Sequence, residues 1–175
     1  VLGVGYQSPS PYYETEHVKV NFPEGVKIVK AESGISSTCA IDTEGILWCW
    51  GHNTYGQTGS GSTETYLDSP ERVLIDSNET IVDVALGYQY KCALTVSQQI
   101  YCWGNNNYGQ LHFSSSDFSE KTMPTKIDIP NGINPVSISS KQSHTCILND
   151  NGATYCWGYN NFGQLGDGTT INRDK

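Results

Sequence analysis

The sequence has little charge, a single methionine and no long apolar run. Charged residues make up only 16% of its 175 residues, a composition that fits neither a disordered chain nor a helical bundle. No apolar stretch approaches the roughly 18 residues of a membrane-spanning helix, and no segment shows the 3.6-residue period of an amphipathic helix. These absences favour an all-β protein.

Basic residues are also scarce. The 10 Lys and Arg residues are outnumbered by 18 Asp and Glu residues, which gives a net charge of −8. Nucleic-acid binding needs clustered Lys and Arg that neutralise phosphates, and the sequence has no such cluster. We therefore expect no nucleic-acid partner, and we attribute the acidic balance to solubility.

What the sequence does contain is one block that occurs three times. The copies read CAIDTEGILWCWGHNTYGQTG from Cys39, CALTVSQQIYCWGNNNYGQLH from Cys92 and CILNDNGATYCWGYNNFGQLG from Cys146. Their first cysteines lie 53 and 54 residues apart. A fixed period of this size indicates one supersecondary unit copied along the chain. Because repeat arrays usually present loops to partners, we expect no enzyme activity.

All six cysteines belong to this block, in pairs separated by ten positions. Opposed residues of a hairpin have Cα atoms about 4.5–5.5 Å apart, which is within disulfide range. We therefore expect three disulfides, Cys39–Cys49, Cys92–Cys102 and Cys146–Cys156. Zinc binding is a rival that lacks its usual close Cys spacing, and reduced cysteines in a cytosolic chain are another. Disulfides favour an extracellular or cell-surface location, where Asn78 is a possible N-glycosylation site.

Each cysteine pair encloses a three-residue turn. Gly45 and Gly152 occupy the position of such a turn that favours a left-handed backbone. Gln98 stands there in the second copy, which predicts that this turn differs from the other two.

Two further strands per unit are predicted by β-branched stretches around each hairpin. They lie at 26–29, 81–85 and 135–138 before the hairpins, and at 72–75 and 125–129 after them, with 17–20 as the incoming equivalent. Four short strands per unit predict a four-stranded antiparallel sheet. Copies of such a sheet bury both faces by stacking radially as the blades of a β-propeller. A parallel β-solenoid is the alternative.

The phase of the block divides the chain. We expect residues 1–175 to be a single propeller segment, with approximate repeats 3–58, 59–111 and 112–165 and the start of the next repeat at 166–175. Both ends of the sequence fall at the same position of the repeat, because Gly3 and Gly166 each follow a leucine as the last glycine of the repeated block. The sequence is therefore expected to be part of a longer array.

The string from the first cysteine through C-W-G-x-N-x-[YF]-G-Q resembles the regulator of chromosome condensation repeat. The matching columns are Gly51, Gly104 and Gly158; Asn53, Asn106 and Asn160; Tyr55, Tyr108 and Phe162; and Gln57, Gln110 and Gln164. The resemblance implies a closed ring of about seven blades, three of which lie in this sequence. We expect the tryptophan of each copy to pack between blades, and the Asn and Gln columns to hydrogen-bond the following turn.

No catalytic residues, cofactor site or metal site stand out. The four histidines, His17, His52, His112 and His144, are spread over the repeats. Asp167-Gly168-Thr169 and the run 105–107 are calcium candidates, but they lack EF-hand spacing and are more simply explained as turns. The copies diverge most at 6–17, 60–69 and 112–123, polar and aromatic loops that suit recognition.

These observations predict a non-catalytic extracellular β-propeller that binds a protein or glycan partner, or that self-assembles as a structural module. The family resemblance implies one alternative, a guanine-nucleotide exchange factor or chromatin-associated regulator. Acidity and paired cysteines weigh against it. Another alternative is the targeting module of a larger enzyme.

Overall fold

The computed structural model describes residues 17–76, 78–113 and 117–174. Within these ranges the chain forms strands and turns but no helix, which confirms the all-β prediction. The first sheet contains β1 (Ile28–Ser33), β2 (Ser37–Asp42), β3 (Leu47–His52) and β4 (Tyr66–Arg72). The second contains β5 (Ile81–Leu86), β6 (Tyr90–Thr95), β7 (Ile100–Gly104) and β8 (Lys121–Lys126). The third contains β9 (Pro135–Lys141), β10 (His144–Asn149) and β11 (Thr154–Gly158).

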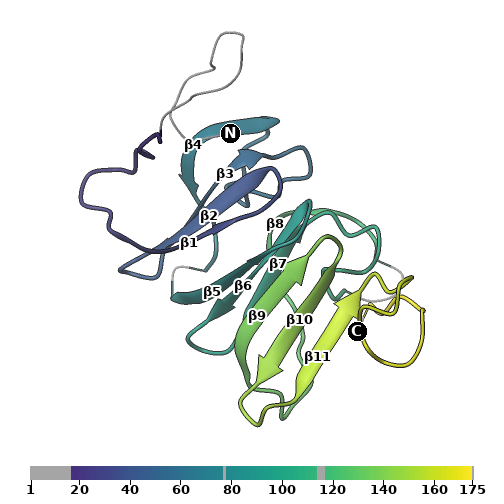
Figure 1. The fold of residues 1–175 in the computed structure, drawn as a ribbon. Coiled ribbons are helices and arrows are strands. Elements are labelled where there is room, and N and C mark those ends of the chain that lie inside the picture. The colour runs from purple at the N-terminus through teal and green to yellow at the C-terminus, as the bar shows by residue number, and fades with distance from the viewer. Residues whose placement is uncertain (1–16, 77, 114–116, 175) are drawn as a thin grey trace.

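The sheets are antiparallel meanders that stand side by side in chain order (Figure 1). Strands β1, β5 and β9 are the first of each sheet, and neighbouring members of this set are in contact. Each sheet is thus a propeller blade, and the predicted architecture is confirmed. Each four-stranded blade takes its last strand from beyond the expected repeat boundaries at 58 and 111. The structural blades are therefore shifted by one strand from the sequence repeats.

The core lies between the blades. One buried cluster joins Cys39, Ile41 and Val73 of the first blade to Ala93 and Trp103 of the second. A second cluster joins residues of the second blade to Ile138, Ile147 and Trp157 of the third. A sheet that is apolar on both faces gains this burial only from neighbours on each side, which is why the repeated sequence specifies an array.

The last strand of each complete blade was predicted at the wrong residues. Segments 72–75 and 125–129 were expected, but the strands are β4 at 66–72 and β8 at 121–126. Val73 and Ile127 are buried directly after these strands, so the apolar pattern marked interblade packing rather than strand pairing. The strands themselves contain Pro70 and Pro124, which an outer edge tolerates because its outward N–H groups need no partner.

In the third blade the described residues form three strands, and an isolated bridge between Gly158 and Arg173 stands where β4 and β8 begin to pair in the other blades. Three smaller expectations were wrong. The strand predicted at 26–29 is β1 at 28–33, and residues 17–20 form no strand. The turn at Gln98 does not differ, because Gln98 has a φ of 61°, like Gly45 at 76° and Gly152 at 86°. Tertiary context thus holds a non-glycine residue in the left-handed region, which costs about 1 kcal/mol or more.

A polar link ties the three inner strands together. The Asp83 carboxylate on β5 accepts hydrogen bonds from Lys30 on β1 and from the Ser137 hydroxyl on β9, with donor–acceptor distances of 2.5 and 3.1 Å. The three residues occupy the same position of successive blades. Because the pairs are partly buried, this link adds to the packing that sets the angle between blades.

Candidate functional site

The disulfides are formed where the hairpin geometry placed them. Cys39–Cys49, Cys92–Cys102 and Cys146–Cys156 each join opposed residues of two paired strands, with Cα atoms 4.1–4.2 Å apart. Every cysteine is therefore paired. Asn78 lies exposed in a turn between β4 and β5, so it is accessible, and its glycosylation stays a prediction.

Two residues of the tryptophan column join one blade to the next, as predicted, whereas Trp50 packs with Ala40 and Leu67 of its own blade. The indole N–H of Trp103 donates to the carbonyl of Gln57 at 3.0 Å. The indole N–H of Trp157 donates in the same way to the carbonyl of Gln110 at 2.9 Å. Both rings are buried, so each tryptophan adds a directional bond to the packing between blades.

The Asn column shapes the loop that follows each tryptophan. The Asn53 side-chain oxygen accepts from the backbone N–H of Thr58 at 3.1 Å, and Asn106 accepts from Leu111 at 3.0 Å. The Gln column acts within the same loop, because the Gln110 side-chain oxygen accepts from the backbone N–H of Tyr108 at 2.8 Å. These loops are therefore held by buried amides and are rigid platforms.

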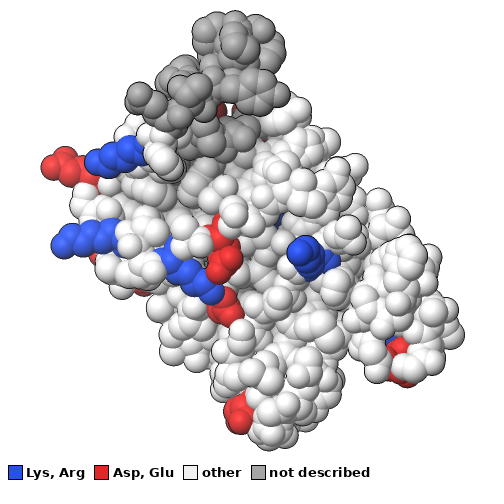
Figure 2. All heavy atoms as spheres, in the orientation of Figure 1, with Lys and Arg blue, Asp and Glu red and all other residues white. Residues whose placement is uncertain are grey.

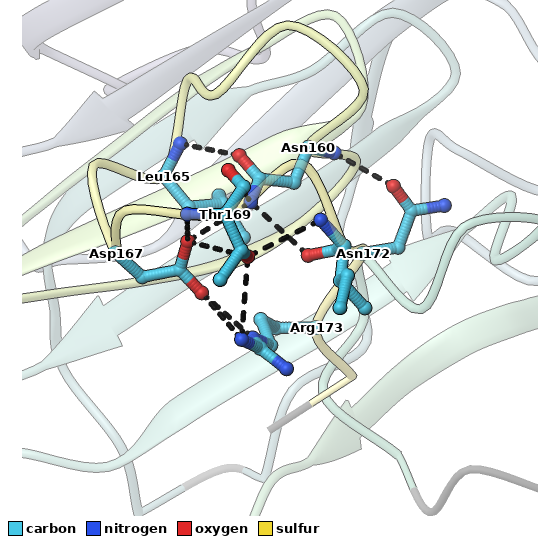
Figure 3. A network of polar contacts seen from close by, with 7 residues as sticks. Asn160, Leu165, Asp167, Thr169, Asn172 and Arg173 are labelled. Carbon is cyan, nitrogen blue, oxygen red and sulfur yellow. Dashed lines mark hydrogen bonds and ion pairs between the residues drawn. The ribbon is translucent and has the colours of Figure 1, made fainter.

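The third copy of this loop carries the fullest network (Figure 3). Asn160 accepts from Leu165 N–H at 2.9 Å and donates to the Thr169 carbonyl at 3.1 Å. The Asp167 carboxylate accepts from Thr169 and from the Arg173 guanidinium, and these hydrogen bonds hold the pKa of Asp167 below its usual range. The Arg173 Nη2 atom lies 2.7 Å from the Asp167 Oδ2 atom and neutralises its charge. The calcium candidate at this position is therefore explained as a turn held by an ion pair.

A concave pocket lies between the tips of the inner hairpins. We call it the tip pocket; it measures about 530 Å³, and its lining residues are Ile35, Tyr88, Gln89, Asn105, Asn107, Tyr108, Gln110, Gln142, Ser143 and Tyr159. They come from the β1–β2, β5–β6 and β9–β10 turns and from the loops after β7 and β11. The volume is within the usual range for small-ligand pockets, about 300–1,000 Å³.

The frame of the tip pocket is fixed by hydrogen bonds. The Tyr88 N–H donates to the Gln142 carbonyl at 2.8 Å, which joins the hairpin tips of two blades. Gln142 has a left-handed φ of 50°, a strained conformation that recurs at functional sites. The Asn105 side-chain oxygen accepts from Asn107 N–H and from the Gln110 side chain, at 3.0 and 3.1 Å. The pocket is thus preorganised.

Other polar groups of the tip pocket are left unused. Within residues 17–76, 78–113 and 117–174, no hydrogen bond is made by the side chains of Gln89, Asn107, Gln142 or Ser143. The hydroxyl of Tyr108 is equally without a partner in this part of the chain. Unpaired donors and acceptors that converge on a rigid concavity are the usual signature of a binding site.

Exposed aromatic rings form one rim of the tip pocket. Tyr108 and Tyr159 meet edge to face with centroids 4.9 Å apart, and Phe162 lies against Tyr159 at 6.0 Å. Phe162 is 85% exposed and Ile35 is 71% exposed. Large rings that remain in solvent on a fixed frame suit contact with a partner.

Sequence reasoning missed this pocket. It pointed to the long loops at 6–17, 60–69 and 112–123, yet none of the residues that the structure describes in these loops lines the tip pocket. Residues 6–16 and 114–116 lie outside the described residues, so recognition by those loops stays a prediction. The signal that could have found the pocket is the uncharged tip position four residues before each first cysteine, occupied by Ile35, Tyr88 and Gln142.

The described histidines do not converge. The His52 ring hydrogen-bonds the Gln57 and Thr54 side chains, His112 packs against Trp157, and burial lowers the pKa of His144. In the described parts of the chain no cluster of His, Cys, Asp and Glu has the arrangement of a metal site. Nor does any helix there have the length and apolarity to span a membrane.

Comparison with known protein families gives a clear result. The model of the "Regulator of chromosome condensation (RCC1) repeat" matches residues 28–57, 81–110 and 136–164, and a second model with the same description matches 44–94 and 98–148. Each match of the first model spans the first three strands of a blade with its disulfide hairpin, and each match of the second runs from the hairpin of one blade to that of the next.

Two curated relatives illustrate the similarity. The chain is 32% identical over 155 residues to the ultraviolet-B receptor UVR8 of Arabidopsis thaliana, which covers 89% of the chain and 34% of the receptor. It is 31% identical over 138 residues to the human E3 ubiquitin-protein ligase HERC2, covering 79% of the chain and 3% of the ligase. The chain thus spans about a third, or much less, of these relatives.

Solved structures show the same fold. Human WBSCR16 superposes with a TM-score of 0.83 at 20% identity, over 98% of this chain and 43% of that one. Yeast RCC1 (Prp20), in its structure bound to Kap60, superposes with a TM-score of 0.73 at 20% identity, over 84% of this chain and 36% of that one.

Proposed function

This chain belongs to the regulator of chromosome condensation (RCC1) repeat family, and from this premise we propose that it is a non-catalytic recognition module whose partner binds at the tip pocket. The observation that carries the proposal is a set of amide and hydroxyl groups that make no hydrogen bond within the described residues and stand on a hydrogen-bonded frame. A solved relative is described in complex with a protein, which supports partner binding by this fold.

We further propose that the module works in an oxidising compartment, outside the cell or at its surface. Three disulfides within hairpins are typical of such compartments. The exposed turn at Asn78 is compatible with glycosylation there.

The three blades are proposed to be part of a larger ring. The chain covers 43% of human WBSCR16, which is the share that three blades make of seven. The outer faces of the first and third blades are then covered by further blades of the same protein. Completion of the ring by several chains is the alternative.

Neither of the other candidate functions is favoured by the structure. Docking to chromatin needs a basic surface, whereas the visible face of this molecule is largely neutral with scattered charges of both signs (Figure 2), and the net charge is −8. A catalytic domain elsewhere in the protein is compatible with the proposal, because a recognition module can direct an enzyme to its substrate.

Photo-cross-linking tests the proposal. The full-length protein is expressed in its native source with a photoreactive phenylalanine analogue in place of Tyr108. A matched protein carries the analogue in place of Tyr155. The two tyrosines are 43% and 41% exposed, but only Tyr108 lines the tip pocket. We expect adducts from position 108 alone. Equal yields at both positions, or none at either, contradict binding at the tip pocket.

A further inference from the structure

The three repeats agree at the residues that build the frame, whereas several positions that line the tip pocket differ between them. Gln110 and Tyr108 also line the pocket, but they belong to columns that are alike in all copies. The Trp, Asn and Gln columns are the same in every copy. The residue at the hairpin tip is Ile35, Tyr88 and Gln142 in turn, and all three line the pocket. The residue after the Trp-Gly step is His52, Asn105 and Tyr159, of which the last two line the pocket. The frame is therefore common to the blades, and the hairpin tips that face the pocket are free to differ.

We propose that the tip pocket binds a neutral carbohydrate, as one or two pyranose rings of a glycan. This inference rests on the proposed function and names its ligand class. None of the described residues that line the pocket is charged, although the chain carries 28 charged residues, the 10 Lys and Arg together with the 18 Asp and Glu. A ligand that carried phosphate, sulfate, carboxylate or ammonium groups has no counter-charge in the lining, so its desolvation is uncompensated.

The polar groups of the pocket match the chemistry of sugar hydroxyls. A sugar hydroxyl both donates and accepts a hydrogen bond, and a side-chain amide offers one acceptor and two donors side by side. The unused amides of Gln89, Asn107 and Gln142 therefore suit pairs of neighbouring hydroxyls on one ring. The rings of Tyr88 and Tyr108, in residues that are 45% and 43% exposed, provide apolar surface for the C–H side of a pyranose.

Common peptide-binding modes fit the pocket less well. An added β-strand needs a free strand edge, but the pocket lies at hairpin ends. An amphipathic helix needs an apolar groove, whereas half of the lining residues are amides: Gln89, Asn105, Asn107, Gln110 and Gln142. A proline-rich segment on the tyrosines is the peptide mode to be distinguished by experiment.

Rigidity of the frame lowers the cost of binding a ligand of this kind. Asn105 is 5% exposed and Gln110 is 2% exposed, so their bonds to the loop are shielded from water. The loop from which Asn107 and Tyr108 project is therefore fixed before a ligand arrives, which reduces the ordering cost of binding.

Titration calorimetry of the full-length protein tests the inference. The probes are cellotetraose, chitotetraose, mannotetraose and xylotetraose, together with decaproline as the peptide rival and dextran sulfate as the charged rival. We expect at least one neutral tetrasaccharide to bind, and Tyr108→Ala and Asn107→Ala each to weaken that binding about tenfold. Tyr155→Ala, a tyrosine of matched exposure outside the pocket, is expected to leave it unchanged. Circular dichroism of each variant shows whether the fold is kept.

The outcomes separate this inference from the proposed function. Failure of every neutral probe overturns the carbohydrate inference, as does binding that Tyr108→Ala and Asn107→Ala leave intact. If decaproline or dextran sulfate binds and these variants abolish that binding, the carbohydrate ligand class is overturned. Recognition at the tip pocket then still stands. Failure of all probes, combined with equal cross-linking at positions 108 and 155, overturns both.

Discussion

Replacing Lys91 with threonine is expected to stabilise the protein substantially. Lys91 is fully buried on β6 and lies opposite Trp103, on the sheet face that packs against the first blade. The equivalent residues in the other copies are Thr38 and Thr145. The only hydrogen bond that Lys91 makes in the described part of the chain is to the Tyr90 carbonyl, at 3.3 Å. A buried ammonium group without a carboxylate is costly.

The magnitude follows from the pKa. Burial lowers the pKa of Lys91 from its ordinary 10.5 to about 7. Each pKa unit corresponds to about 1.4 kcal/mol, so the lysine destabilises the fold at neutral pH by about 3–5 kcal/mol. The unfolded chain binds the proton more tightly, so stability rises as pH increases from about 7 toward 10.5 and is constant with respect to this group below 7.

Urea unfolding with the disulfides intact measures the effect. The free energy of unfolding is compared at pH 6, 7, 8 and 9 for the wild type, Lys91→Thr, and Lys126→Thr as an exposed lysine of the same blade. We expect Lys91→Thr to raise stability most at pH 6 and 7, and the gain to shrink by up to about 1.4 kcal/mol per pH unit above that. A constant difference between wild type and Lys91→Thr across this range refutes the reasoning, because it means that Lys91 does not lose its proton on folding.

Three further predictions concern the frame. Gln98→Gly relieves a left-handed φ of 61° and is expected to raise the unfolding free energy by about 1 kcal/mol. Gly152→Gln is the reverse change at an uncrowded position and should lower the unfolding free energy by a similar amount. A melting temperature of Gln98→Gly at or below that of the wild type contradicts this explanation. Trp103→Phe removes the donor to the Gln57 carbonyl and is expected to cost about 1–3 kcal/mol in urea unfolding; an unchanged midpoint shows that water replaces the bond. Alkylation of the native protein without reductant should add no mass, and after reduction it should modify all six cysteines; labelling of the untreated protein sinks the proposal of an oxidising compartment.

The regular spacing of the repeats predicted the blades, the hairpins and the disulfides, because these features recur in every copy. It misplaced β4 and β8, since the outer strand of a blade is an edge with one exposed side. Segments such as Tyr66–Arg72 therefore need little β propensity, and buried residues such as Val73 follow the strand instead of forming it. It also misjudged the turn at Gln98 because propensity is local, whereas the disulfide-bonded hairpin imposes one backbone path on all three copies.

The tip pocket was missed for a different reason. Function was sought in long divergent loops, but the pocket is assembled from single positions that lie more than 50 residues apart in sequence, such as Ile35, Tyr88 and Gln142. They become neighbours only when blades stack, and the hydrogen bond from Tyr88 to Gln142 shows that two of them are held in place by the stacking itself. In a repeat protein, the positions that are identical in every copy identify the residues that build the common blade structure. Because the frame fixes where each variable position points, single differences between copies at the hairpin tips are then the residues free to define a ligand.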